Sequence, residues 1–131
     1  MAGYTTNIER DTLENEAFRK VLYTGSYLQL VLMSVAAGDE IGEEVHGQDQ
    51  FIRVEEGEGK AVLDGEEHAL SDGFVVVIPA GTKHNIINTS ASDALKLYTI
   101  YAPPHHADGT VHQTKAEADK AEEEFHGDTS E

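Results

Sequence analysis

Cysteine is absent from this chain of 131 residues, so neither disulfide bonds nor thiolate metal sites are available to it. Basic residues are scarce: nine lysines and arginines stand against 25 aspartates and glutamates, a formal net charge of -16. Nucleic-acid phosphates require clustered basic side chains, and the nine are scattered, so the composition argues against a nucleic-acid partner. The acidic charge fits either an ordinary solvated surface or a protein from a high-salt cytoplasm, where screening tolerates it.

Long apolar runs are also lacking. No run approaches the roughly 20 residues that a membrane-spanning helix needs. The N-terminal residues MAGYTTN contain no basic region followed by an apolar stretch, which a secretory signal requires. We therefore expect a cytoplasmic protein with no membrane partner. The length is sufficient for one domain with a sizeable core.

Short apolar segments separated by glycine-containing turns fill the middle of the chain. Their regular spacing, with no long amphipathic helix between them, is typical of an all-β fold. A jelly-roll barrel is the expected closure, because it protects the sheet edges. The predicted strands cover residues 19–24, 27–36, 50–56, 60–63, 66–70, 74–78, 84–88 and 95–101. The 74–78 segment is apolar throughout, which predicts burial on both faces.

The two ends of the chain differ from this middle part. The expected organisation is an N-terminal arm over residues 1–17, a β-barrel over 18–104 and a C-terminal extension over 105–131. The arm is polar, and we expect it to lie over the barrel or a partner subunit. Thr114 and Glu117 form a capping box, which predicts a short helix running toward Phe125. Residues after His126 are expected to be disordered.

Polar side chains with metal-ligand chemistry stand in two strand-turn units. Glu44 and His46 are two residues apart and share one face of an extended segment, Gln50 heads the next strand, and His84 opens a later one. If these side chains point inward, one carboxylate, one amide oxygen and two imidazoles converge inside the barrel. This donor set suits one divalent transition metal, namely Mn, Fe, Ni, Zn or Cu. Four protein ligands leave a position open for water or substrate, as in a working site.

The spacing of these residues resembles the two motifs of the cupin superfamily. The second motif, G-x5-P-x-G-x2-H-x3-N, is matched at every fixed position between Gly73 and Asn88. The first usually reads G-x5-H-x-H-x3,4-E-x6-G, and here Glu44 replaces its first histidine while Gln50 replaces its glutamate. The resemblance is to small single-domain cupins, including mannose-6-phosphate isomerase-like members. It implies a double-stranded β-helix barrel whose metal is held by Glu44, His46, Gln50 and His84.

Several alternatives remain open at this stage. His46 and His84 could be hydrogen-bonded barrel histidines without a metal, and Glu44 could be a solvated loop acid. The resemblance implies a metal-dependent enzyme with isomerase or lyase chemistry on a small carbonyl, hydroxy or sugar-like compound. The rival functions are an Fe- or Ni-dependent dioxygenase and a non-catalytic metal or ligand binder. A sugar phosphate is disfavoured, because few basic residues lie in the barrel region to hold it.

Other residues are weaker candidates. Those that could line the pocket or support the metal ligands are Asn88, Tyr98, His105 and His112. The segment PPHHADGTVH places three histidines within eight residues. They lie either on the surface or with one of them at the barrel mouth, where it could support the metal ligands or act as an acid or base near neutral pH. We also expect a homodimer, with Phe51, Arg53 and the 19–24 strand as candidates for its interface. Arg53 should point away from the metal.

Overall fold

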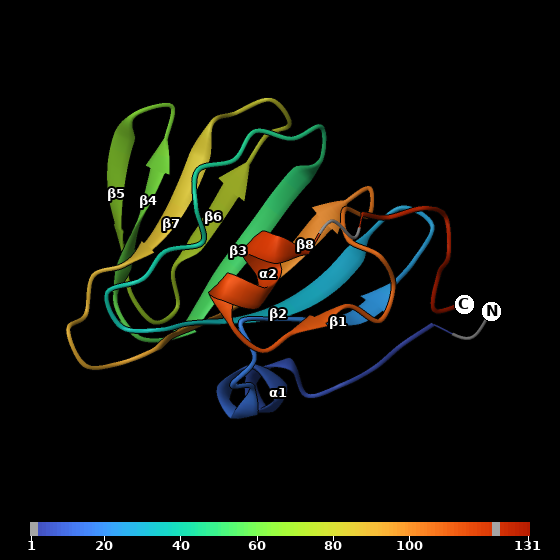
Figure 1. Ribbon diagram of the computed structural model, residues 1–131, viewed down its shortest axis with the longest axis horizontal. Coiled ribbons are helices and arrows are strands. Elements are labelled where there is room, and N and C mark those ends of the chain that lie inside the picture. Colours follow the sequence, from blue (N-terminus) through green and yellow to red (C-terminus); the bar gives the residue numbers. More distant parts are fainter. Residues whose placement is uncertain (1–2, 122–123) are drawn as a thin grey trace.

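The protein folds into two antiparallel β-sheets with two short helices (Figure 1). The computed structural model describes residues 3–121 and 124–131. The elements are α1 (Ile8–Glu14), β1 (Arg19–Thr24), β2 (Gln29–Val35), β3 (Asp49–Glu56), β4 (Gly59–Leu63), β5 (Glu66–Leu70), β6 (Val75–Ile78), β7 (His84–Asn88), β8 (Leu95–Ala102), β9 (Val111–His112) and α2 (Lys115–Lys120). The larger sheet has the order β6-β3-β8-β2-β1-β9, and the smaller has the order β5-β4-β7. The predicted jelly-roll class and all eight predicted strands are confirmed.

A single apolar core lies between the two sheets. Alternation along the strands builds it, because every second side chain of β2, β3, β7 and β8 points inward. The fully buried members include Val31, Met33, Ile52, Ile86 and Leu97. Each such aliphatic side chain contributes about 1.5–3 kcal/mol when fully buried. Toward one end of the strands the inward positions become polar, and there the core gives way to the candidate site.

Strand β6 is not buried on both faces, so that prediction is wrong. Its burial alternates: Val76 and Ile78 face the core, whereas Val75 is 45% exposed and Val77 is 63% exposed. The neighbouring Phe74 is 50% exposed. β6 is the terminal strand of the larger sheet and pairs with β3. The apolar run of β6 therefore has one face in the core and one apolar face exposed on the surface.

The N-terminal segment contains a helix that the predicted polar arm did not include. Asn7 caps α1, its side chain accepting a hydrogen bond from the Arg10 amide at 3.0 Å. The helix contacts β8, β3 and β2, and Lys96 donates to the carbonyl oxygen of Leu13 at 2.7 Å. The Asn7 cap with acidic residues in the first turn was the available sequence signal.

The C-terminal extension is more closely attached than predicted. β9 pairs with β1 and so adds a strand to the larger sheet. The Thr114 cap of α2 is confirmed, since its hydroxyl accepts from the Glu117 amide at 3.1 Å. The helix ends at Lys120, well before Phe125, and residues 122–123 of the predicted helix lie outside the described part. Beyond His126, the predicted disorder is wrong: the Ser130 amide donates to the Thr24 carbonyl oxygen at 2.7 Å.

Two glycines shape the turn between β3 and β4 for different reasons. Gly57 has a φ of 103°, in the left-handed region. Gly59 instead permits a close approach, because a Cβ there would lie 2.5 Å from the carbonyl oxygen of Ile87.

Neither described helix is long and apolar enough to cross a membrane.

Candidate metal centre

Strand direction brings the candidate residues to one end of the two sheets. Gln50, near the start of β3, lies opposite Tyr101, near the end of the antiparallel strand β8. Glu44 lies opposite His84, the first residue of β7, in an isolated antiparallel bridge. Their backbones exchange both hydrogen bonds, at 2.8 and 2.9 Å. Strands β3 and β8 of the larger sheet, and β7 with the bridged segment at Glu44, therefore present polar side chains at the same end.

The turn between β6 and β7 is fastened to the segment that carries His46. The Gly81 amide donates to the His46 carbonyl oxygen at 2.9 Å, and the Ala80 amide donates to Asp49 Oδ1 at 2.8 Å. Gly81 has a φ of 86°, which a glycine adopts without strain. Because this turn leads directly into His84, the same contacts set the positions of both motif histidines.

Backbone carbonyl groups fix the tautomers of the two motif histidines. His46 Nδ1 lies 3.1 Å from the Gln48 carbonyl oxygen, and His84 Nδ1 lies 2.8 Å from the Thr82 carbonyl oxygen. A carbonyl oxygen only accepts, so each Nδ1 donates. The Nε2 atoms then carry the lone pairs in the neutral rings, which is the form that binds a metal. The two ring centroids are 4.8 Å apart.

Gln50 turns its amide oxygen toward His46. Its amide nitrogen donates to Thr99 Oγ1 at 3.0 Å, and its Oε1 lies 3.2 Å from His46 Nε2. Gln50 is only 5% exposed. Two atoms that both carry lone pairs therefore face each other in a buried position, an arrangement that a cation bound by both would stabilise.

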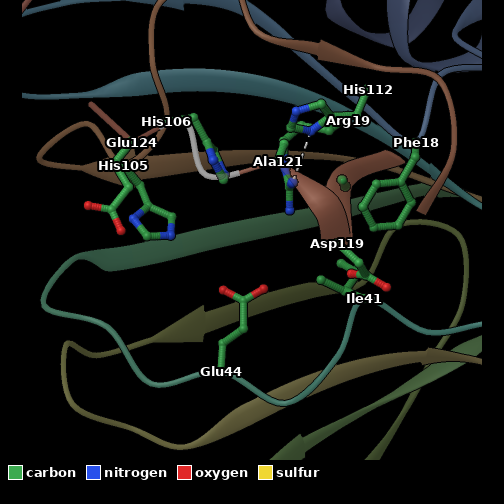
Figure 2. A pocket seen from close by; sticks show the side chains of 11 residues that line it. Phe18, Arg19, Ile41, Glu44, His105, His106, His112, Asp119, Ala121 and Glu124 are labelled. Atoms are coloured by element: carbon green, nitrogen blue, oxygen red, sulfur yellow. Dashed lines mark hydrogen bonds between the residues drawn. The ribbon is translucent and has the colours of Figure 1, made fainter. Parts of the chain in front are cut away.

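His105 joins this group from the loop after β8. One ligand atom each from Glu44, His46 and His105 all lie within 4.8 Å of one another. The His46 and His105 ring centroids are 4.8 Å apart. Figure 2 shows the Glu44 carboxylate and the His105 ring directed into one cavity. Of the three histidines in PPHHADGTVH, His105 is thus the one grouped with Glu44 and His46.

Burial adjusts the protonation of the groups around the site. It lowers the pKa of His105 to about 4, with smaller effects from His46, Arg19 and His84. Burial likewise raises the pKa of the Tyr101 hydroxyl, and the charge of Glu44 adds to that effect. At neutral pH His105 is therefore uncharged and offers a lone pair, whereas Tyr101 keeps its proton.

The other predicted candidates lie elsewhere. Asn88 sits at the far end of β7 from His84, where its side-chain nitrogen donates to the carbonyl oxygens of Val35 and Asp93. Tyr98 is on the outer face of β8, with its ring 6.3 Å from that of Phe51. Both residues therefore support packing outside the group of donors.

His112 lies at the cavity, whereas Arg53 points away from it. His112 is buried and lines the cavity that Glu44 and His105 also line. Arg53 points away from the site, as expected, and pairs with Glu55 of its own strand at 2.6 Å.

Two residues at the site, Tyr101 and Arg19, were not predicted. Tyr101 lies within ring contact of His46 and His105, with centroid distances of 5.8 and 5.2 Å. The alternation of β8 could have indicated it, since Tyr101 shares a face with Leu95 and Leu97. His106 and Arg19 are buried beside the same cavity. The position of Arg19 depends on contacts between distant parts of the chain, so no local pattern indicated it. His106 belongs to the histidine-rich segment that the sequence placed either on the surface or at the barrel mouth.

The family model named Cupin domain matches residues 31–101, just over half of the chain. The protein belongs to the cupin family. A relative, the uncharacterized protein YrkC of Bacillus subtilis (strain 168), is 46% identical over 127 residues. The match covers 92% of this chain and 68% of that relative. Cupin membership and the jelly-roll fold are therefore established.

Two further similarities bear on structure and chemistry. The crystal structure of BH2720 from Bacillus halodurans matches with a TM-score of 0.89 at 46% identity, covering 92% of this chain and 96% of that one. Quercetin 2,3-dioxygenase of Bacillus subtilis (strain 168) is 36% identical over 78 residues. That match covers 59% of this chain but only 23% of the dioxygenase, so it concerns one part of a longer protein.

Proposed function

We propose that the protein is a metal-dependent enzyme that acts on a small carbonyl, hydroxy or sugar-like compound, with isomerase or lyase chemistry. One divalent transition metal would be held by Glu44, His46, Gln50 and His84, as the sequence predicted. The geometry adds His105 as a fifth candidate donor, because it lies with Glu44 and His46 in one group. The donor set of imidazoles and oxygens fits Mn, Fe, Ni, Zn or Cu.

The observation that carries this proposal is the close approach of His46 Nε2 and Gln50 Oε1, at 3.2 Å. With Nδ1 of His46 and the amide nitrogen of Gln50 both donating elsewhere, two lone pairs meet. A shared metal ion would satisfy both. In the metal-free protein the amide can rotate by half a turn, so that its nitrogen donates to His46 while the Thr99 hydroxyl donates to its oxygen. Gln50 thus suits both states.

A bound metal of this kind supplies Lewis-acid polarisation of a carbonyl or hydroxyl oxygen. The residues of the chain supply the rest. Glu44 provides the anionic charge among the candidate donors. Tyr101 keeps its proton, because burial raises the pKa of its hydroxyl, and its ring packs against those of His46 and His105. His105 is neutral at pH 7 and can accept a proton or bind the metal.

A dioxygenase is the second candidate function. The similarity to quercetin 2,3-dioxygenase, at 36% identity over 78 residues, favours it specifically. Oxygen uptake by Fe-loaded protein with a panel of catechols and diketones would distinguish it from isomerase or lyase chemistry, which consumes no oxygen.

Metal loading followed by a substrate screen tests the proposed function. Protein stripped of metal should take up one Mn, Fe, Ni, Zn or Cu per chain. The loaded form should then convert a small hydroxy or carbonyl compound without consuming oxygen. Protein that loads one metal but turns over nothing in the screen would instead be a non-catalytic binder. Failure to bind any of the five metals would contradict the metal-dependent function itself.

Removing the His105 imidazole tests whether this residue is a ligand or a proton acceptor. If it binds the metal, we expect His105→Ala to weaken metal affinity by more than about 100-fold, beyond the roughly 10–100-fold loss of a group that only supports a ligand, measured by calorimetry of stripped protein. If it accepts a proton, affinity should stay within about threefold while turnover falls by about 10²-fold or more. His126→Ala is the matched control, since His126 is exposed in the same C-terminal extension. Unchanged affinity and turnover would remove His105 from the site.

We further propose a homodimer formed through the exposed apolar face of β6. Phe74, Val75 and Val77 stand exposed together, and Phe51 and Tyr98 contact each other on the outer side of the same sheet. Such an apolar surface is typical of an interface between subunits. This face differs from the predicted β1 surface, because β1 lies inside the larger sheet between β2 and β9.

A single charge on β6 should dissociate this dimer. We expect Val77→Glu to lower the mass measured by light scattering at micromolar protein from two chains to one. Val111→Glu is the control, because Val111 is 40% exposed and lies on β9, at the opposite edge of the larger sheet from β6. A monomeric parent protein, or a dimer that persists in the Val77 variant, would show that β6 is not the interface.

A further inference from the structure

A cavity of about 610 Å³ opens beside the candidate metal donors. Glu44 and His105 line one side of it, and α2 contributes Ala118 and Asp119. Arg19 and His106 line another part, on the side of the larger sheet. Figure 2 shows Arg19 extending into this space between His112 and Glu44. The cavity therefore connects the metal donors with a cationic side chain.

Arg19 is buried without a carboxylate partner in residues 3–121 and 124–131. The residue is 8% exposed, and its Nη1 donates to His112 Nδ1 at 3.3 Å. Its guanidinium carbon lies 5.3 Å from the Phe18 ring centroid. The buried Nε atom has no hydrogen-bond partner there. An arginine cannot lose its charge, so a buried guanidinium in this state strongly favours an anion.

The other two arginines of the chain show what Arg19 lacks. Arg10 pairs with Asp11 at 3.1 Å, and Arg53 pairs with Glu55 at 2.6 Å. Both are much more exposed than Arg19. The chain has 25 acidic residues and nine basic ones. Even so, of its three arginines the buried one is the arginine that has no carboxylate partner in the described part of the structure.

Three acids line the cavity, Glu44, Asp119 and Glu124, and none of them pairs with Arg19 within the described residues. Asp119, which lines the cavity, already accepts from Lys115 at 2.8 Å. Glu44 belongs to the group of metal donors. His106 Nε2 is buried and, within the described residues, has no partner. Two buried nitrogens without hydrogen-bond partners, one of them on a cation, therefore belong to residues that line the same cavity.

We propose that Arg19, with His106, binds the carboxylate of a small oxygenated acid whose hydroxyl or carbonyl group faces the metal donors. This inference rests on the proposed function and specifies its substrate class as hydroxy or oxo carboxylic acids, including sugar acids. A single planar guanidinium matches the two oxygens of a carboxylate. A phosphate would call for further basic groups, and none of the residues that line the cavity besides Arg19 is a lysine or arginine.

Nuclear magnetic resonance on the unaltered sequence tests this directly, because the chain has only three arginine Nε–H groups to resolve. Arg10→Lys and Arg53→Lys identify the other two signals. In Zn-loaded protein, lactate and gluconate should shift the Arg19 signal, whereas the neutral counterparts lactamide and sorbitol should not. Binding of the acids without a change at Arg19, or no binding up to tens of millimolar, would overturn the proposal.

Removal of the charge gives a second, quantitative test. Arg19→Met keeps the apolar part of the side chain and should weaken lactate and gluconate binding about 10–100-fold, as expected for loss of a charge-assisted hydrogen-bonded pair. Its metal content should equal that of the parent protein. Arg53→Met is the control and should bind both acids normally. Equal acid binding in the Arg19 and Arg53 variants would contradict the proposal.

The same experiments separate this inference from the proposed function. If the parent protein holds no metal but the acids still shift the Arg19 signal in metal-free protein, the anion site stands and the metal-dependent function fails. If metal binds normally and the acids leave the Arg19 signal unshifted, only the proposed anion site is refuted.

Discussion

Replacing His46 with alanine is expected to lower metal affinity by more than about 100-fold, beyond the roughly 10–100-fold loss typical of removing a group that only supports a ligand. The expectation follows from the central position of His46. Its ring contacts those of His84 and His105, and its Nε2 faces Gln50 Oε1. Removing it therefore takes away the one donor that links all the others. Calorimetric titration of stripped protein with Mn or Zn gives the affinity directly.

The matched control is His68→Ala, because His68 is an exposed histidine in the middle of β5. It should bind metal like the parent protein. Far-UV circular dichroism should show the same β content in both variants, since His46 lies outside the apolar core. Full metal occupancy in the His46 variant would show that this imidazole is not a ligand.

Exchanging charge between Glu44 and Gln50 is expected to produce a compensated effect. The usual cupin set of three histidines and one glutamate carries a ligand charge of about -1. Here the substitution of Glu44 for a histidine adds a negative charge, and Gln50 in place of the glutamate removes one. Because buried charge interacts strongly at low effective dielectric, this balance should dominate metal affinity.

Glu44→Gln should therefore lose about 100-fold or more in metal affinity, since it leaves the candidate donors neutral. Gln50→Glu should keep or tighten binding, because the two side chains have the same shape and each offers an oxygen. The double variant should recover most of the loss. Glu43→Gln is the control, as Glu43 is exposed and pairs with Lys83 at 3.4 Å. Parent-like affinity in the Glu44 variant would make Glu44 a loop acid.

The fold could be predicted because its determinants are local. Glycine turns, apolar alternation and the fixed spacing between Gly73 and Asn88 all act within short segments, and the strands formed as they indicated. The two motifs together predicted that His46 and His84 would lie close to each other, and their ring centroids are 4.8 Å apart.

Residues from distant segments could not be predicted in this way. His105 reaches His46 only because the chain turns back after β8, and Arg19 is buried beside β9, which pairs with β1. No spacing rule links position 19 to position 112. The position of Tyr101, by contrast, followed from the face that Leu97 occupies, and Tyr98 was the wrong choice between two nearby tyrosines.

An apolar pattern also does not say what covers it. Strand β6 is apolar at each position, yet Val75 and Val77 are exposed while Val76 and Ile78 are buried. Sequence shows that a face is apolar, and only the arrangement of the sheets shows whether the core or another surface lies against it. In the same way, Asn88 matched its motif, although its amide supports the backbone instead of the metal donors.

X-ray absorption of Zn-loaded protein tests the central claim most directly, because it reports which atoms surround the metal. The account predicts the scattering pattern of at least two imidazole rings, with the remaining donors being oxygen at about 2.0–2.2 Å. In the His46→Ala protein the imidazole contribution should fall. A zinc ion surrounded only by oxygen atoms, with no imidazole signal in the parent protein, would contradict the assignment of this site.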